Sequence, residues 1–159
     1  IVERGAPAFR REQIAEQIGR HAIAFAVARV TVEEIDRHNI LHARMIGLAR
    51  AVALLDPAPT LALIDGNRLP GQLCCQGEAV VQGDRLIPAI MAASILAKVT
   101  RDREMRQLDQ YYPGYGLARH KGYPTAAHLA ALQRLGPTPI HRRSYAPVRR
   151  LLETGAESP

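Results

Sequence analysis

Hydrophobic side chains recur at the spacing of one helical face in several stretches of the chain. In the first stretch, Ile14 and Ile18 lie four residues apart among charged neighbours. Thr31 and Glu34 have the spacing of a capping box, which predicts that a short helix begins there. The helices predicted by periodicity cover residues 10–20, 39–55 and 88–108. A further helix is predicted after Thr125, through about Leu135, and Gly136 closes it.

Three other stretches have the patterns of strands. Residues 22–30 alternate small with larger apolar side chains, which predicts a strand. Residues 61–64 and 78–81 are short apolar runs bounded by turn residues, as in strands covered on both faces. Asp65 ends the first run and Asp84 follows the second. Sites in α/β sheets form at the carboxyl ends of strands, so we expect these two carboxylates to meet.

The charge of the chain favours a polyanionic partner. The 159 residues are 47% hydrophobic, enough for one compact domain with a core. The formal net charge is +6, and clustered lysine and arginine gain affinity for phosphates by releasing counterions. Nucleic acid is therefore the first candidate, and a merely basic surface is the alternative.

The cysteines and the apolar runs bear on the compartment. Cys74 and Cys75 are adjacent, so they give no framework of long disulfide-closed loops, and no partner residues lie at zinc spacing. No apolar run approaches the roughly 20 residues needed to cross a bilayer. We expect a cytoplasmic monomer that does not bind membranes.

Several short motifs follow one another along the chain. They are Asn-Ile-Leu-His at 39–42, Leu-Ile-Asp-Gly-Asn at 63–67, Gly-Asp at 83–84, Ala-Ala-Ser-Ile-Leu-Ala-Lys-Val-Thr-Arg-Asp at 92–102, Gly-Tyr-Gly at 114–116, His-Lys-Gly-Tyr-Pro-Thr at 120–125 and His-Arg-Arg-Ser-Tyr at 141–145. Together they resemble the motifs of bacterial ribonuclease HII, the type 2 ribonuclease H family. The resemblance covers nearly all of the chain from about residue 12 to residue 151.

The resemblance implies a fold and a reaction. The fold would be α/β and ribonuclease H-like, a mixed sheet flanked by helices, in one domain over residues 1–159 with a helical and basic C-terminal region at 124–159. The reaction would be hydrolysis of the RNA strand of RNA/DNA hybrids, and cleavage of duplex DNA on the 5′ side of embedded ribonucleotides.

The resemblance also implies a metal site. Four carboxylates hold Mg²⁺ or Mn²⁺ in this family, and two of them match Asp65 and Asp84. The other two belong to an Asp-Glu-x-Gly-Arg-Gly motif on the first strand, which this sequence does not contain. We therefore expect an N-terminally truncated chain that lacks the first two strands and is inactive by itself. The alternative role for each aspartate is a strand-end residue that binds loop amides.

Candidate substrate contacts follow from the same motifs. Tyr123 matches the family tyrosine that stacks on the sugar next to the ribonucleotide, and its alternative role is packing against the next helix. Asp102 is either an outer partner of the site or an intrahelical partner of Lys98. The remaining candidate phosphate contacts are Asn67, Arg68, Lys98, Arg101, His120, Lys121, Arg142 and Arg143. The alternative role of Asn67 and Arg68 is to tie their loop, and His120, Lys121, Arg142 or Arg143 taken alone is a solvated surface charge.

Two other functions compete with the nuclease. A fragment that only binds duplexes would use the same basic surface without cleavage. A nucleotide-binding α/β enzyme would fit the alternation of strands and helices. No glycine-rich phosphate loop follows any predicted strand, which counts against the second.

Overall fold

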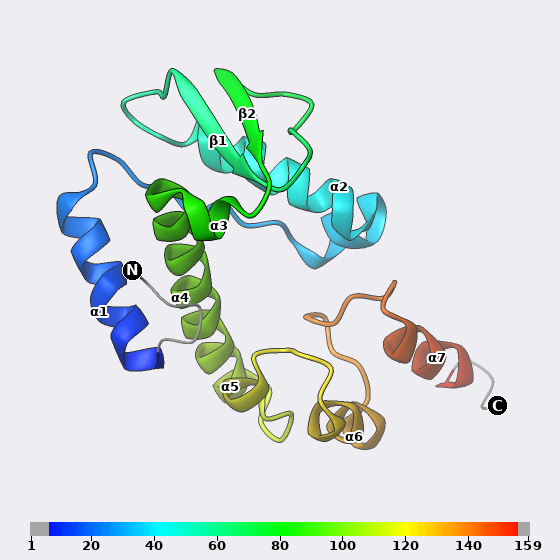
Figure 1. Cartoon of the computed structure of the whole chain (residues 1–159). Helices are drawn as coiled ribbons and strands as arrows, with labels where there is room; N and C mark the ends of the chain where they lie inside the picture. Colours follow the sequence, from blue (N-terminus) through cyan, green and yellow to red (C-terminus); the bar gives the residue numbers. More distant parts are fainter. Residues whose placement is uncertain (1–6, 156–159) are drawn as a thin grey trace. The chain divides into compact units, whose positions relative to one another are not determined.

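The computed structural model describes residues 7–155, and the chain divides into two compact units (Figure 1). Ile1–Arg29 and Arg44–Thr100 belong to the first unit, and Val30–Ala43 and Arg101–Pro159 to the second. The elements in chain order are α1 (Ala8–His21), α2 (Val32–Ala53), β1 (Leu61–Asp65), β2 (Gln76–Val80), α3 (Gly83–Leu86), α4 (Pro88–Tyr111), α5 (Leu117–His120), α6 (Ala126–Leu135) and α7 (Ala146–Gly155). The single domain expected over residues 1–159 stays a prediction.

Helix α2 consists of two helical sections that meet at Asn39. This residue has a φ of 63° and a ψ of 164°, which no helix contains. Its side-chain oxygen accepts the amides of Leu41 at 3.0 Å and His42 at 3.1 Å, so it caps the second section. At the start of the first section, Thr31 and Glu34 exchange the two hydrogen bonds of a capping box. The predicted short helix and the long helix after it are both confirmed.

The sheet of the first unit has two parallel strands. β1 pairs with β2 in a register that places Leu61 opposite Gln76 and Asp65 opposite Val80. The amide of Gly66 extends this pairing by donating to the carbonyl of Val80 at 2.9 Å. Both predicted strands are confirmed, the second two residues earlier at its start and one at its end. The sheet found over residues 7–155 is purely parallel, so the expected mixed sheet is not observed.

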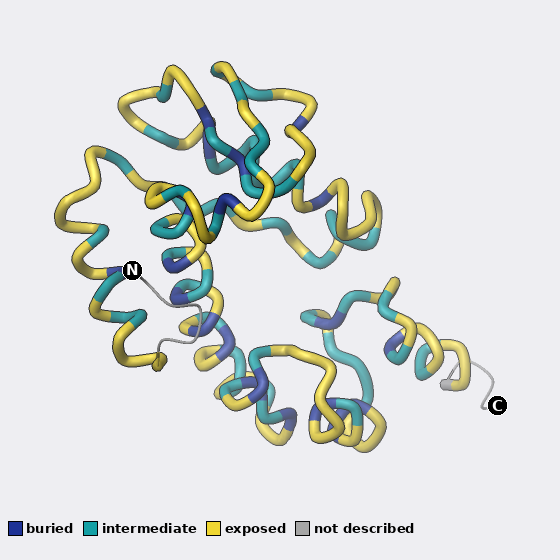
Figure 2. The backbone as a smooth tube through the Cα atoms, viewed as in Figure 1, coloured by how far each residue is buried: buried dark blue, intermediate teal, exposed yellow. Residues whose placement is uncertain are grey.

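Two apolar clusters form the core of the first unit. Val52 of α2 packs with Ala62 and Ile64 of β1, so the second section of α2 covers the strands. In the second cluster, Ala15 and its neighbours on α1 pack against Ile95 and Val99 on α4. Figure 2 shows buried stretches in dark blue along α4, which runs beside α1. The 3.6-residue periodicity of each helix therefore identified its packed face.

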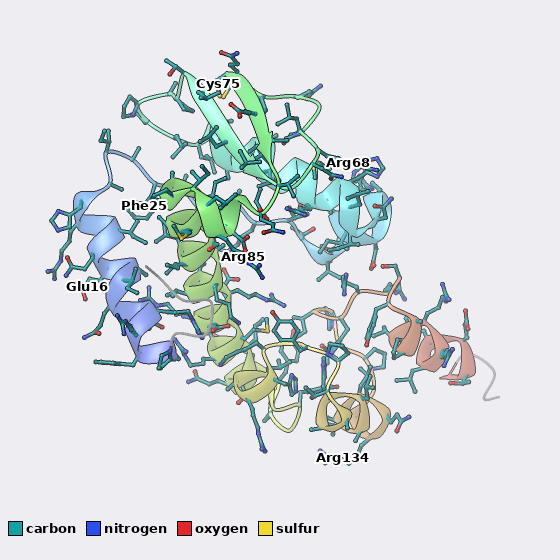
Figure 3. The ribbon with its side chains drawn as sticks, viewed as in Figure 1. Glu16, Phe25, Arg68, Cys75, Arg85 and Arg134 are labelled. Carbon is teal, nitrogen blue, oxygen red and sulfur yellow. The ribbon has the colours of Figure 1, made fainter. Side chains whose placement is uncertain are left out.

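The predicted strand over residues 22–30 is wrong. This segment is extended, but it belongs to no strand of the described structure. Ile23 is 90% exposed, and Phe25, labelled in Figure 3, is 52% exposed. Residues 22 and 24–28 line an apolar pocket of about 580 Å³ together with parts of β1, α2 and α4. The alternation was real, but a strand needs a neighbour for its backbone hydrogen bonds, and the described residues supply none here.

The second unit has its own core around α6. Leu117, Leu132 and Val148 are almost fully buried, and Tyr115 packs with them. The side chain of Thr125 caps α6 by accepting the amide of His128 at 3.2 Å, and Gly136 ends the helix. No helix in the described part of the chain is long and apolar enough to cross a membrane.

Candidate metal and nucleic-acid site

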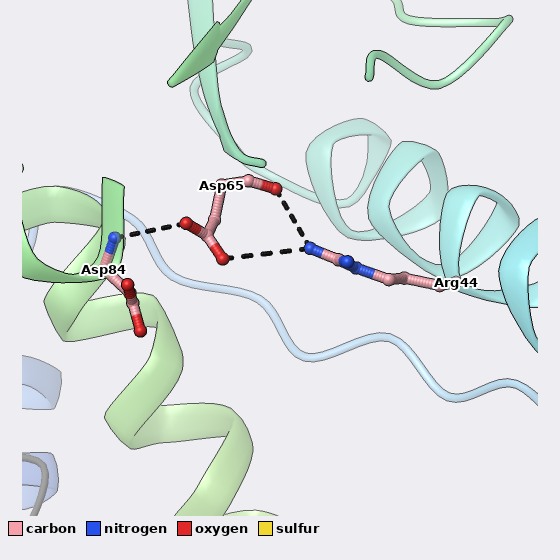
Figure 4. A network of polar contacts seen from close by, with 3 residues as sticks. All are labelled: Arg44, Asp65 and Asp84. Carbon is pink, nitrogen blue, oxygen red and sulfur yellow. Dashed lines mark hydrogen bonds and ion pairs between the residues drawn. The ribbon is translucent and has the colours of Figure 1, made fainter. Parts of the chain in front are cut away.

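Asp65 and Asp84 come together at the carboxyl end of the sheet in the first unit. Asp65 is the last residue of β1, and Asp84 lies in the short helix α3 that follows β2. The amide of Asp84 donates to Oδ1 of Asp65 at 3.3 Å (Figure 4). The parallel strands bring the two residues to the same sheet edge, as the sequence pattern predicted.

Arg44 is a residue of this site that the sequence reasoning missed. Its Nη2 donates to the main-chain oxygen of Asp65 at 2.9 Å and lies 3.8 Å from the carboxylate Oδ2 of the same residue (Figure 4). Arg44 belongs to α2 and lies in none of the motifs singled out from the sequence. No local signal marks a partner 21 residues away. Only the packing of α2 against β1 creates this contact.

Gly83 allows α3 to approach the end of β1. A Cβ atom at this buried position would lie 2.5 Å from Cδ1 of Ile90 and 3.3 Å from Cβ of Val80. It would also lie 3.6 Å from Oδ1 of Asp65. The glycine before Asp84 therefore fits a close approach of backbone to the site.

The carboxylate oxygens of Asp65 and Asp84 are suitable ligands for a hard cation, but they are only two groups. Carboxylate oxygens are the ligands that Mg²⁺ and Mn²⁺ prefer, and Mg²⁺ is commonly held by one or two carboxylates with substrate phosphate and water completing the shell. Asp65 makes two long contacts through its carboxylate, which has about four lone-pair positions, so acceptor capacity remains. Among residues 7–155, however, no group of three or more acidic, histidine or cysteine side chains could hold a metal ion. Over the described residues, the candidate metal ligands at this edge are therefore Asp65 and Asp84.

The other candidates of the first unit lie near this edge or on α4. Asn67 and Arg68 are exposed in the loop after β1, where Figure 3 labels Arg68. Lys98 is half-buried on α4. The side chains of the loop stand free of the core, so both roles considered for them remain open.

The candidates of the second unit differ in exposure. Tyr123 is 61% exposed, whereas Asp102 is buried at 6%. Arg101 is exposed, and its Nη2 would lie 3.3 Å from a Cβ at Gly122. The guanidinium therefore sits against the loop that carries Tyr123. Lys121 is half-buried and donates from Nζ to the carbonyl of Ala118.

The structure does not support a phosphate contact for His120. The ring is buried, with Nε2 bonded to the carbonyl of Tyr115 at 2.7 Å and Nδ1 accepting the amide of Gly122 at 3.2 Å. Both ring nitrogens are therefore used by the backbone. The sequence made His120 a candidate phosphate contact, and only the fold shows that its ring is buried.

Arg142 and Arg143 lie in the loop before α7 in the second unit. Arg143 is exposed, and Arg142 lies over the ring of Tyr145. The candidates thus divide between the units, with Asp65, Asn67, Arg68, Asp84 and Lys98 in the first and Arg101, Asp102, His120, Lys121, Tyr123, Arg142 and Arg143 in the second.

Comparison with known proteins decides which family these motifs represent. The sequence model described as Ribonuclease HII matches residues 8–148, most of the chain. The chain belongs to the ribonuclease HII family. A curated ribonuclease HII from Marinomonas sp. (strain MWYL1) is 56% identical over 144 residues, which are 91% of this chain and 72% of that protein. Ribonuclease HII enzymes are hydrolases of the ribonuclease H class, so family membership implies endoribonuclease activity on RNA/DNA hybrids.

Solved structures show the corresponding fold. The crystal structure of ribonuclease H2 from Pyrococcus horikoshii OT3 matches with a TM-score of 0.79 at 24% identity, covering 97% of this chain and 80% of that one. Ribonuclease HII from Archaeoglobus fulgidus, solved in complex with PCNA, matches with a TM-score of 0.60 at 21% identity over 89% of this chain and 75% of that one. The ribonuclease H2-like fold is therefore confirmed.

Proposed function

We propose that this ribonuclease HII chain carries half of a divalent-metal site that cleaves the RNA strand of RNA/DNA hybrids and cuts DNA on the 5′ side of embedded ribonucleotides. The observation that supports the proposal most is the meeting of Asp65 and Asp84 at neighbouring strand ends, 3.3 Å from amide to carboxylate. The two aspartates are 19 residues apart in the sequence, and the parallel pairing of β1 and β2 brings both to one edge of the sheet.

Asp65 and Asp84 would hold Mg²⁺ or Mn²⁺. Such an ion, when bound, lowers the pKa of a water nucleophile and stabilises the departing 3′ oxygen. Arg44 donates a hydrogen bond to the main-chain carbonyl of Asp65, and its guanidinium lies 3.8 Å from Oδ2, where it would compete with a bound cation. Gly83 lets the backbone at Asp84 come close enough to bond to that carboxylate.

Tyr123 is proposed to read the sugar of the ribonucleotide. Its ring is exposed, and the 2′-hydroxyl that separates RNA from DNA must be approached closely. The phosphate backbone would be held by Asn67, Arg68, Lys98, Arg101, Lys121, Arg142 and Arg143, since most protein contacts to duplexes go to phosphate and sugar. Asp102 is buried, so it is proposed to orient a neighbouring side chain rather than to contact substrate.

The 159-residue chain by itself is proposed to bind duplex without cutting it. Two carboxylates are half of the family's set, and no third acidic group joins them over residues 7–155. A positively charged surface needs no metal to bind phosphates, so binding should persist in EDTA.

The decisive experiment compares the chain with a chimera. Strands carrying Asp-Glu-x-Gly-Arg-Gly from a full-length family member are fused ahead of Ile1, and both proteins are given a duplex with one ribonucleotide, with Mg²⁺ or Mn²⁺. We expect the chimera to cut 5′ of the ribonucleotide, and Asp65→Asn in the chimera to remove that cleavage. An all-DNA duplex is the control substrate.

Each result has a distinct meaning. Efficient cleavage by the unextended chain would overturn its inactivity and leave the nuclease assignment in place. A folded chimera that cuts nothing, or that cuts equally well with Asp65→Asn, would overturn the metal role of this pair.

A further inference from the structure

Residues 142–145 form a tight turn in the second unit. The carbonyl of Arg142 accepts the amide of Tyr145 at 3.1 Å, the bond that closes a β-turn. The amides of the two central residues, Arg143 and Ser144, take no part in that bond and need other partners. The guanidinium of Arg142 lies 5.8 Å from the centre of the Tyr145 ring, within cation–π range. The turn thus carries two arginines on a folded backbone.

Asp36 supplies the missing partners from a distant part of the sequence. Its Oδ2 accepts the amide of Arg143 at 2.8 Å, and its Oδ1 accepts the amide of Ser144 at 3.0 Å. The hydroxyl of Ser144 also donates to Oδ1. Asp36 lies in the first section of α2, 107 residues before Arg143, and both belong to the second unit. Three bonds to one carboxylate hold the turn in a single orientation.

The carboxyl group of Asp36 is ionised in this arrangement. Partial burial acts to raise its pKa, but the hydrogen bonds from Ser144 and Arg143 and the nearby charge of Arg142 outweigh that effect. The net result is a pKa below the ordinary value for aspartate. The contact is therefore made by a charged acceptor at neutral pH, where hydrogen bonds are shorter and stronger.

We infer that Asp36 is a positioning residue, which holds the turn of residues 142–144 so that Arg142 and Arg143 meet the phosphate backbone of a bound duplex. The inference rests on the proposed function and adds a role for Asp36, to which the proposed function gives none. Asp36 bonds to backbone amides and a hydroxyl, and the side chain of Arg143 stays exposed. A turn ordered before binding loses less entropy when the duplex arrives.

The sign of one substitution separates this inference from a pure charge effect. Asp36→Asn removes a negative charge from a chain whose formal net charge is +6, so charge alone predicts tighter binding to a polyanion. The positioning role predicts weaker binding, because an amide nitrogen in place of one carboxylate oxygen would face the amide of Arg143 or Ser144 as donor against donor. The two effects have opposite directions.

The test measures affinity of the full chain for an RNA/DNA hybrid by fluorescence anisotropy in EDTA, across a range of salt. We expect Asp36→Asn to weaken binding about tenfold, the change expected for losing a hydrogen bond to a charged group. The slope of log K against log salt should become smaller, because fewer phosphates are contacted. Ser144→Ala should weaken binding by about threefold, and Ser144→Thr, which keeps the hydroxyl, should restore it.

Glu153→Gln is the matched control. It removes one negative charge from α7 in the same unit, where the side chain of Glu153 is 65% exposed and lies 3.9 Å from Arg149. Its binding should equal or slightly exceed that of the wild type. Relaxation of the Arg143 and Ser144 amides, followed by NMR without nucleic acid, should show faster motion only in the Asp36 and Ser144→Ala variants.

The inference is overturned if Asp36→Asn binds as tightly as Glu153→Gln with an unchanged salt slope. It is also overturned if the two amides stay ordered in Asp36→Asn while affinity falls. A wild-type chain that does not bind the hybrid would instead remove the proposed function, before any variant is compared.

Discussion

Asp65 has different partners at its two carboxylate oxygens, and this decides how it responds to a cation. Oδ1 accepts the amide of Asp84, and Oδ2 faces the guanidinium of Arg44 at 3.8 Å. Both contacts are long, and the side chains of the ion pair are 51% and 37% exposed, so the pair stabilises the fold little. A divalent ion at Oδ2 would share this oxygen with Arg44.

Removing Arg44 should therefore favour metal binding. We expect Arg44→Met to tighten Mn²⁺ binding about threefold, within the range typical of exposed ion pairs. Asp65→Asn should weaken it by about tenfold or more, because a neutral amide replaces the anionic ligand. Mn²⁺ electron paramagnetic resonance measures both. Arg20→Met, which removes the same charge from α1, where Arg20 pairs with Glu16, should change nothing. Weaker binding in Arg44→Met would contradict the competition.

The contacts of His128 and His141 could not be predicted from the residue types in the sequence. His128 and His141 are buried, and their Nε2 atoms lie 3.4 Å apart. Nδ1 of His128 bonds to the carbonyl of Tyr123, and Nδ1 of His141 accepts the amide of Thr138. These partners fit neutral rings, with Nε2–H of His141 donating to Nε2 of His128. A proton added to either ring would place donor against donor.

This network predicts a loss of stability in mild acid. Burial lowers the pKa of both His128 and His141 below the ordinary 6.5, and the charge of a neighbouring histidine lowers each pKa further. The unfolded chain then binds more protons than the folded chain. The stabilisation from these two neutral rings is therefore fully present above about pH 6.5. The free energy of unfolding falls as the pH drops below that value through the folded-state pKa values.

Urea unfolding at a series of pH values, with NMR titration of the ring protons, measures this effect. The other ionisable groups facing these rings are His120, stacked on His128 at 4.3 Å, and Tyr115, 5.3 Å from His141. His141→Gln should flatten the dependence below about pH 6.5, because only one ring of the pair remains to titrate. An unchanged slope in this variant would refute the assignment.

At the scale of elements, the residues that begin and end helices were the features most directly predicted from the sequence. The capping box at residues 31 and 34 and the stop at Gly136 were predicted from residue types, and both are present. The same holds for the paired apolar runs that became β1 and β2. These signals are local, because each rests on atoms within a few residues.

The cap of α6 gives a stability prediction. Thr125→Ala removes the oxygen that accepts the amide of His128 and should lower the free energy of unfolding by about 1 kcal/mol. Thr125→Ser keeps the oxygen and should stay within a few tenths of the wild type. Chemical denaturation of both variants measures the difference. Equal losses in the two variants would mean that the methyl group, not the hydrogen bond, stabilises the helix.

At the scale of the whole molecule, charge sets how the chain meets nucleic acid. The formal net charge is +6, and the arginines proposed to contact phosphate lie in both units. We expect log K for an RNA/DNA hybrid to fall linearly with log salt, with a slope of roughly −0.9 for each phosphate contacted. Arg143→Gln should reduce that slope by about one without changing the free energy of unfolding. A salt-independent affinity would contradict phosphate contacts.

The sequence by itself determined the elements whose causes are local. Periodicity located α1 and α4, end signals located α6, apolar runs located β1 and β2, and the order of the motifs indicated the family. It misjudged residues 22–30, because alternation signals a pleated surface but cannot say whether a neighbouring strand exists. The tertiary structure alone decided the contacts of Arg44, His120 and Asp36. Each joins atoms whose spacing along the chain carries no information about distance, since the packing of helices and turns brings them together.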